Sequence, residues 1–106
     1  MTQTMTVAIV DDEPDMRESI SQWLTLSGFT TEVFASAEDA LKVIGPDWPG
    51  AIITDIRMPG MDGMAFLKRL MGQDSALPVI MITGHGDVPM AVEAMRLGAM
   101  DFMEKP

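Results

Sequence analysis

The stretch that decides the fold runs from residue 7 to residue 14 and reads VAIVDDEP. Four apolar residues in a row predict a short strand covered on both faces, the usual form of a strand in a parallel sheet. Two aspartates follow the strand directly. Pro14 then opens a helix, because proline suits the first helical turn. The stretch therefore predicts a strand–turn–helix unit with acidic side chains at the carboxyl end of the strand.

The rest of the chain repeats this alternation of apolar runs and amphipathic stretches. Strands are expected at residues 7–10, 29–34, 51–54, 78–82 and 100–103, and the helices between them begin near Pro14, Ser36, Asp62 and Asp87. Alternation of this kind predicts an α/β fold, a doubly wound parallel sheet of five strands with helices on both faces. Trp23, on the apolar side of the first helix, is expected in the core.

The ends of the chain lead to two further expectations. The sequence stops at Pro106, where a fifth helix would be expected to follow the fifth strand. We therefore expect one small domain over residues 1–106, with the fifth helix missing and residues 1–5 disordered or flexible.

Composition excludes several classes of function. The chain has 106 residues, 16 acids against 7 Lys and Arg, and a net charge of −9. This balance argues against direct nucleic-acid binding by this segment, which needs a basic face, and against an anionic membrane surface. No apolar run approaches the roughly 20 residues that span a bilayer, and the start does not resemble a signal peptide. With no Cys, the chain fits a reducing compartment, so we expect a cytoplasmic protein.

Reactive side chains follow four of the five expected strands. Asp11 and Asp12 follow the first, Asp55 the third, Thr83 the fourth and Lys105 the fifth. Each alone has a plain structural explanation, as a helix cap, a turn or strand residue, or a solvated cation. Ligands of open α/β sheets bind beyond the carboxyl ends of the strands. The five residues together therefore predict one site at that rim.

The chemistry of these groups favours a metal-assisted phosphoryl transfer. If the first and third strands are neighbours, about 4.8 Å apart, Asp12 and Asp55 can share a cation. Crowded carboxylates repel unless an ion or a raised pKa relieves them, and oxygen ligands favour a hard ion such as Mg²⁺. Asp55 can act as a nucleophile that forms an aspartyl phosphate. Thr83 and Lys105 can then bind phosphoryl oxygens.

Over residues 6–106 the chain resembles response-regulator receiver domains of bacterial two-component signalling. The matching stretches are VDDE at 10–13, TDIRMPGMDG at 54–63, ITG at 82–84 and DFMEKP at 101–106. The resemblance implies the flavodoxin-like or CheY-like sheet with strand order 2-1-3-4-5, here truncated before the fifth helix. The segment TGHGDVPM at 83–90 is similar to regulators of the dicarboxylate-transport and nitrogen-control type and to the FixJ type, which the sequence does not separate.

The resemblance also implies a role for each site residue. Asp55 receives a phosphoryl group from a sensor histidine kinase. Asp12 and Asp55 bind Mg²⁺ directly, Asp11 binds it mainly through water, and the main-chain carbonyl of Arg57 completes the protein ligands. Lys105 contacts the phosphoryl group. Such a domain is not an enzyme with an external substrate, because it catalyses only its own phosphorylation and dephosphorylation.

Signal output is implied in the same way. Thr83 and Phe102 form a switch pair, in which the hydroxyl moves toward the phosphate and the ring turns inward. The change controls a transcriptional output through a downstream DNA-binding domain of the full-length protein. A homodimer is expected through the fourth helix and fifth strand. The Lys105–Pro106 peptide is expected to be cis.

Three alternatives remain at this stage. The first is a non-phosphorylated pseudo-receiver used for protein contacts, against which the complete set of site residues argues. The second is a phosphatase of the haloacid dehalogenase type, which would place an Asp-x-Asp pair after the first strand. The third is a flavin mononucleotide binder, which needs a Ser/Thr/Gly-rich phosphate loop where this chain has acids. His85 is either a residue that tunes dephosphorylation or a solvated loop residue.

Overall fold

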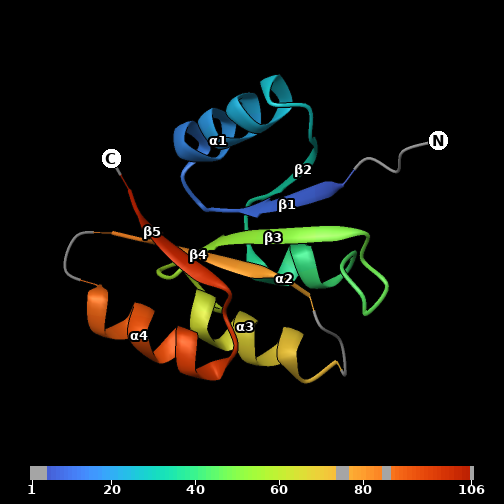
Figure 1. Cartoon of the computed structure of the whole chain (residues 1–106). Helices are drawn as coiled ribbons and strands as arrows, with labels where there is room; N and C mark the ends of the chain where they lie inside the picture. Colours follow the sequence, from blue (N-terminus) through green and yellow to red (C-terminus); the bar gives the residue numbers. More distant parts are fainter. Residues whose placement is uncertain (1–4, 74–76, 85–86, 106) are drawn as a thin grey trace.

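Strands and helices alternate along the chain as the apolar pattern predicts (Figure 1). The structure is a computed structural model that describes residues 5–73, 77–84 and 87–105. In chain order its elements are β1 (Thr6–Val10), α1 (Pro14–Leu26), β2 (Thr30–Phe34), α2 (Ala37–Leu41), β3 (Gly50–Asp55), α3 (Gly63–Met71), β4 (Val79–Thr83), α4 (Val88–Leu97) and β5 (Asp101–Glu104). The expectations for residues 1–4, His85 and the Lys105–Pro106 peptide lie outside the described residues.

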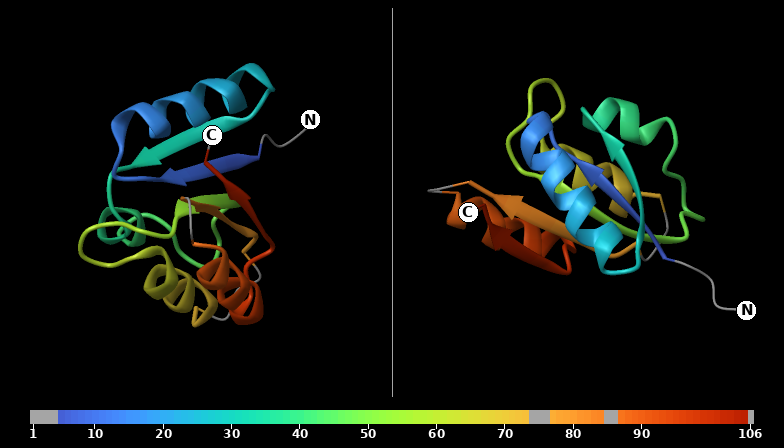
Figure 2. Two further views of the ribbon diagram at one scale, coloured as in Figure 1. Left: turned by 90° about the vertical axis from the view of Figure 1, so that its left-hand side faces the viewer. Right: turned by 90° about the horizontal axis from the view of Figure 1, so that it is seen from above.

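The strands form one parallel sheet in the order β2-β1-β3-β4-β5, which confirms the expected order. Helix α1 covers one face, and α2, α3 and α4 lie against the other (Figures 1 and 2). The register pairs Val10 with Thr54 and Asp55 with Ile82. The carboxyl ends of β1, β3 and β4 therefore meet at one edge of the sheet.

Alternate residues of the central strands pack on opposite faces, as the pleat of a strand requires. The larger cluster lies on the side of α2, α3 and α4 and includes Ala8, Val10, Ile52 and Phe66. The smaller cluster joins Val7, Ile9, Ile53 and Ile82 to Leu24 of α1. Because β1 and β3 are buried on both sides, the acidic residues that follow or end them are fixed by the core.

Two of the predicted helix caps are present and one is not. Ser36 Oγ accepts a hydrogen bond from the Asp39 amide at 3.1 Å, and an Asp62 carboxylate oxygen accepts one from the Ala65 amide at 2.9 Å. The prediction that the Asp87 side chain caps α4 is wrong, because it makes no capping hydrogen bond. Its carboxylate is engaged by another partner, described below.

The expectation that Trp23 lies in the core is also wrong, since it is 65% exposed. Helix α1 directs Ile20 and Leu24, one turn apart, onto the sheet. Trp23 lies beside this narrow stripe and does not reach the sheet. Within the described residues, no helix has the length and apolar character to cross a membrane.

Candidate functional site

Three carboxylates gather at the carboxyl edge of the sheet. Asp11 and Asp12 follow β1, and Asp55 is the last residue of the neighbouring β3. Each offers an oxygen, and these oxygens all lie within 4.8 Å of one another. Asp11 and Asp55 are buried. The structure therefore brings together the three acids that the sequence assigns to a metal site.

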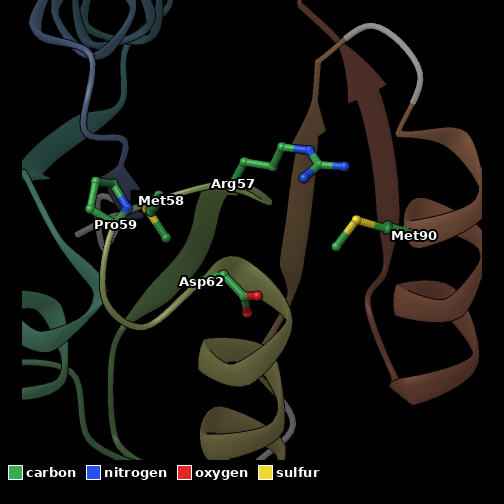
Figure 3. A pocket seen from close by; sticks show the side chains of 5 residues that line it. All are labelled: Arg57, Met58, Pro59, Asp62 and Met90. Carbon is green, nitrogen blue, oxygen red and sulfur yellow. The ribbon is translucent and has the colours of Figure 1, made fainter.

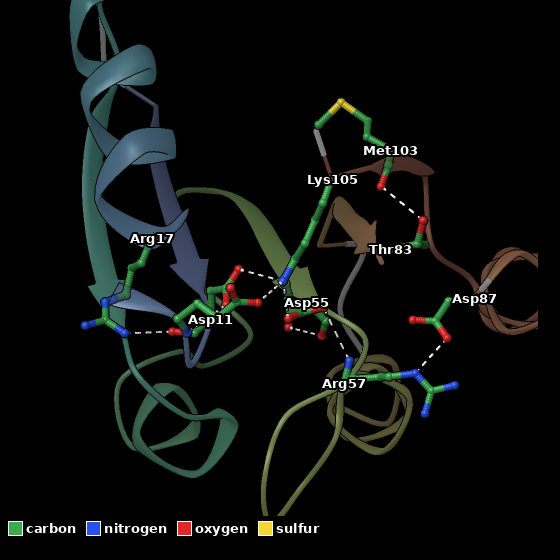
Figure 4. Close-up of polar contacts among 10 residues, drawn as sticks. Asp11, Arg17, Asp55, Arg57, Thr83, Asp87, Met103 and Lys105 are labelled. Atoms are coloured by element: carbon green, nitrogen blue, oxygen red, sulfur yellow. Dashed lines mark hydrogen bonds and ion pairs between the residues drawn. The ribbon is translucent and has the colours of Figure 1, made fainter. Parts of the chain in front are cut away.

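Lys105 reaches into this cluster from the end of β5 (Figure 4). Its Nζ lies 2.8 Å from Asp55 Oδ2, 2.7 Å from Glu13 Oε1 and 3.7 Å from Asp11 Oδ2. Its amide donates to the Thr83 carbonyl at 2.8 Å, which fixes the start of the side chain. Burial alone would lower the pKa of Lys105, but hydrogen bonds to Asp55 and Glu13 and the charge of the acids raise it. The ammonium is therefore a firmly held positive charge beside Asp55.

Asp11 carries the clearest sign that the cluster suits a cation. Its Oδ1 accepts the Glu13 amide at 2.9 Å, but its buried Oδ2 has no hydrogen-bond partner within the described part of the chain. Burial raises the pKa of Asp11, and the nearby charge of Asp55 adds to the effect. A buried acceptor without a partner costs free energy unless something satisfies it. An oxygen-binding divalent cation would do so, so the residues fit the expected metal.

The loop after β3 is held against the site through its backbone. The Arg57 amide points at Asp55 Oδ1 at 3.4 Å. Thr54 Oγ1 donates to the Asp55 carbonyl at 3.1 Å. A Cβ on Gly63 would overlap that same carbonyl oxygen, so only glycine allows α3 to begin this close to Asp55. These contacts fix the direction of the Asp55 backbone.

A second contact holds the middle of the same loop. Glu38, on α2, accepts a hydrogen bond from the Met61 amide at 3.0 Å, and this bond lowers the pKa of Glu38. Gly60 beside it has a φ of 74°, a conformation that favours glycine. The loop that contains Arg57 is thus tied to the sheet at one end and to α2 in its middle.

The two predicted switch residues lie on neighbouring strands, Thr83 at the end of β4 and Phe102 in β5. Thr83 ends β4 and is fully buried, and its hydroxyl donates to the Met103 carbonyl at 3.4 Å (Figure 4). The hydroxyl is therefore turned toward β5 in this structure. Phe102 is half-buried and packs against the larger apolar cluster.

Sequence reasoning missed two contacts at the site. Glu13 is not among the residues that the sequence assigns to the site, yet it accepts a hydrogen bond from Lys105. Arg57 was assigned a role for its carbonyl, yet its side chain forms an ion pair with Asp87, Nε to Oδ1, at 2.6 Å. Arg57 and Asp87 are 30 positions apart in the sequence, so no local pattern could reveal the pair.

Comparison with known proteins gives consistent matches. The family model of the response regulator receiver domain matches residues 7–106. The chain is 48% identical over 106 residues to the C4-dicarboxylate transport transcriptional regulatory protein DctD of Rhizobium meliloti, covering 100% of this chain and 23% of that protein. It is 51% identical over 102 residues to the transcriptional regulatory protein FixJ of the same organism, covering 95% of this chain and 50% of that protein.

A solved structure agrees with these sequence matches. The crystal structure of FixJ-N superposes with a TM-score of 0.90 at 50% identity, covering 99% of this chain and 84% of that one. The chain thus spans a quarter to a half of the length of these curated relatives, and most of the length of this structural neighbour.

Proposed function

The chain belongs to the response regulator receiver family, and from that membership we propose that it is a phosphoacceptor switch in which Asp55 receives a phosphoryl group. The observation that carries this proposal is the position of Asp55. Its carboxylate lies beside two further acids and 2.8 Å from an ammonium group, at the open edge of a rigid sheet. Receiver domains are signalling modules, and two relatives of this chain are transcriptional regulatory proteins by name.

The chemical step follows from the groups present. A carboxylate oxygen of Asp55 attacks the phosphorus of a phosphohistidine on a sensor kinase. A P–O bond forms, the P–N bond breaks, and the leaving imidazole takes up a proton. The ammonium of Lys105 neutralises charge on the phosphoryl oxygens while the buried β3 keeps the attacking oxygen in place. The domain thus promotes its own phosphorylation and dephosphorylation and has no external substrate to turn over.

A magnesium ion fits the acidic cluster. Asp11, Asp12, Asp55 and the main-chain carbonyl of Arg57 would hold it, with Asp11 acting mainly through water. When bound, the ion neutralises charge on the transferring phosphoryl oxygens. The buried Asp11 oxygen, which has no hydrogen-bond partner among the described residues, and the raised pKa of Asp11 support this assignment.

Thr83 and Phe102 are the proposed transmitters of the signal. The Thr83 hydroxyl, which donates to Met103 here, would turn to a phosphoryl oxygen, and the half-buried Phe102 ring would move inward. Phosphorylation would then favour one of two arrangements through its different contacts with each.

Three partners follow as proposals. The phosphodonor is a sensor histidine kinase, and the output is a downstream DNA-binding domain of the longer cytoplasmic protein. A homodimer through α4 and β5 is supported by an exposed apolar stripe along α4, formed by Val88, Val92 and Met95. Analytical ultracentrifugation with and without phosphodonor tests the dimer. A monomer under both conditions would contradict it.

The test of the main proposal is labelling by acetyl phosphate in the presence of Mg²⁺, followed by mass spectrometry of the intact protein. We expect one phosphoryl group on the wild type and none on Asp55→Asn. Asp47→Asn, at an exposed loop position, is the matched control and should label normally. Undiminished labelling of Asp55→Asn would disprove the assignment. An unlabelled wild type would instead favour the pseudo-receiver alternative.

A further inference from the structure

The Arg57 side chain turns away from the acids that lie next to it. Its backbone amide is 3.4 Å from Asp55 Oδ1, so the residue begins beside the acidic cluster. Its guanidinium nevertheless extends in the other direction and meets Asp87 at 2.6 Å (Figure 4). Three crowded carboxylates, with one buried oxygen lacking a partner, would attract this second cation. Some contact must therefore outweigh that attraction.

Asp87 is the contact that holds the guanidinium. Its side chain is only 4% exposed, whereas that of Arg57 is 69% exposed. A buried carboxylate needs a partner, and among the described residues the Asp87 side chain pairs with Arg57. Asp87 also stands at the helix-cap position of α4 without capping it. The carboxylate is thus committed to the arginine and not to its own helix.

Packing alone does not hold Arg57 in place. Its side chain lies over an open pocket of about 350 Å³ lined also by Met58, Pro59, Asp62 and Met90 (Figure 3). Figure 3 shows the guanidinium at the mouth of this pocket, between the loop after β3 and α4. Space around the side chain leaves it free to turn once its ionic partner is removed.

We propose that Asp87 is a positioning residue that keeps the Arg57 guanidinium out of the acidic cluster, so that the carboxylates stay open to a divalent cation. The inference rests on the metal site described under the proposed function. Without Asp87, Arg57 turns toward Asp55 and Asp11 and competes with the metal ion. One cation, Lys105, is already inside the cluster, and a second would cancel half of the charge that remains on the three carboxylates.

The test is a double-mutant cycle on Arg57 and Asp87, with the Mg²⁺ dissociation constant measured by NMR titration of the unphosphorylated protein. Asp87→Asn keeps the size and capping ability of the residue and removes its charge. We expect it to weaken Mg²⁺ binding about tenfold, equivalent to about 1.4 kcal/mol. The Arg57 Nε–H resonance should shift at the same time, which reports the arginine directly.

The effect of Arg57→Ala in the two backgrounds separates our proposal from simple loss of charge. Arg57→Ala removes the guanidinium and keeps the main-chain carbonyl that is assigned to the metal ion. We expect it to recover Mg²⁺ binding about tenfold in Asp87→Asn, far beyond its effect in the wild type, because only there is the arginine released. An equal effect in both backgrounds would mean plain long-range electrostatics and would overturn the proposal. A double variant as weak as Asp87→Asn would overturn it too, since Asp87 would then act only on the structure of α4.

Two controls complete the experiment. Glu93→Gln removes an acid that pairs with Arg96 on the same helix and should change the dissociation constant less than twofold. Asp87→Ser, which also removes the charge and offers a hydroxyl at the start of α4, replaces Asp87→Asn if thermal unfolding shows that variant to be unfolded. If the wild type does not bind Mg²⁺ at all, the metal site of the proposed function fails. If it binds and the cycle is additive, only the role of Asp87 fails.

Discussion

Replacing Asp11 with asparagine should stabilise the metal-free protein while removing its response to magnesium. The Asp11 carboxylate is buried, and its Oδ2 has no hydrogen-bond partner among the described residues. Asparagine keeps an oxygen for the Glu13 amide, which Asp11 Oδ1 now accepts at 2.9 Å. The substitution therefore removes a charge and replaces Oδ2, which lies 3.7 Å from Lys105 Nζ, by an amide nitrogen.

The expected size of the effect follows from the distances. Two carboxylates 4.8 Å apart repel by about 3 kcal/mol at an effective dielectric constant of about 20. Asp11 lies within this distance of both Asp55 and Asp12. The repulsion from Asp12 is weaker because its carboxylate is more exposed to solvent. The attraction between Asp11 Oδ2 and the Lys105 ammonium, 3.7 Å away, opposes this repulsion by about 4 kcal/mol at the same dielectric constant. These two interactions nearly cancel, so the gain comes from the cost of burying the charge, which is the largest cause of the raised pKa of Asp11. We expect Asp11→Asn to gain about 1–2 kcal/mol, or roughly 5–10 °C in Tm for a domain of this size.

The pH dependence provides an internal check. The pKa of Asp11 is raised above its ordinary value of 3.8 by burial. A group whose pKa is higher in the folded state adds stability below its unfolded pKa and loses it as the pH rises through the folded value. The advantage of Asp11→Asn should therefore be largest near neutral pH and vanish below about pH 4.

The assay is thermal unfolding followed by circular dichroism, in EDTA and in MgCl₂. At ten times the dissociation constant, Mg²⁺ should stabilise the wild type by about 1.4 kcal/mol. Asp11→Asn should respond much less, and the exposed Asp47→Asn should behave as the wild type in both buffers. A Tm of Asp11→Asn in EDTA at or below that of the wild type would refute this account of the cluster. An undiminished response to Mg²⁺ would refute the assignment of Asp11 to the metal.

Three further outcomes are expected. Gly63→Ala should lower the free energy of unfolding in urea by about 1–3 kcal/mol and slow labelling by acetyl phosphate, because its Cβ would overlap the Asp55 carbonyl. An unchanged free energy of unfolding would show that the loop moves freely. Glu38→Ala should destabilise the protein at neutral pH but not below about pH 4, because the lowered pKa of Glu38 adds stability only above its ordinary value; an equal loss at all pH values would contradict the bond to Met61. Thr83→Ala should still accept the phosphoryl group in the mass-spectrometric assay but lose phosphorylation-dependent dimerisation by ultracentrifugation, and dimerisation that persists would exclude Thr83 as a switch.

The arrangement of the strands could be predicted from the sequence because it depends on local patterns. The apolar run at 7–10 and the acids after it fixed both the strand and the rim where its ligands lie. Likewise, Ser36 and Asp62 cap their helices as expected, since a cap is settled within a few residues. The grouping of Asp11, Asp12 and Asp55 then followed from the topology of parallel strands.

The partner of Asp87 and the exposure of Trp23 depend on groups that are distant in the sequence. A local sequence pattern carries no information about such groups. Asp87 has the sequence position of a cap, but a guanidinium 30 residues away is a stronger partner than the amides of its own helix. Trp23 has the period of a buried residue, yet α1 covers too narrow a part of the sheet to bury it. In both cases tertiary contacts decided between two options that the sequence left equally available.

The bond between Lys105 and Glu13 joins residues 92 positions apart, which has a consequence for how the protein is made. A ribosome adds about 5–20 residues per second, so roughly 5–18 seconds separate the synthesis of the acids from that of the lysine that completes their site. During that interval a nascent chain displays the carboxylates without their ammonium partner. Under the proposed function, a chain that ends before Lys105 would lack the ammonium 2.8 Å from Asp55 and should accept a phosphoryl group poorly.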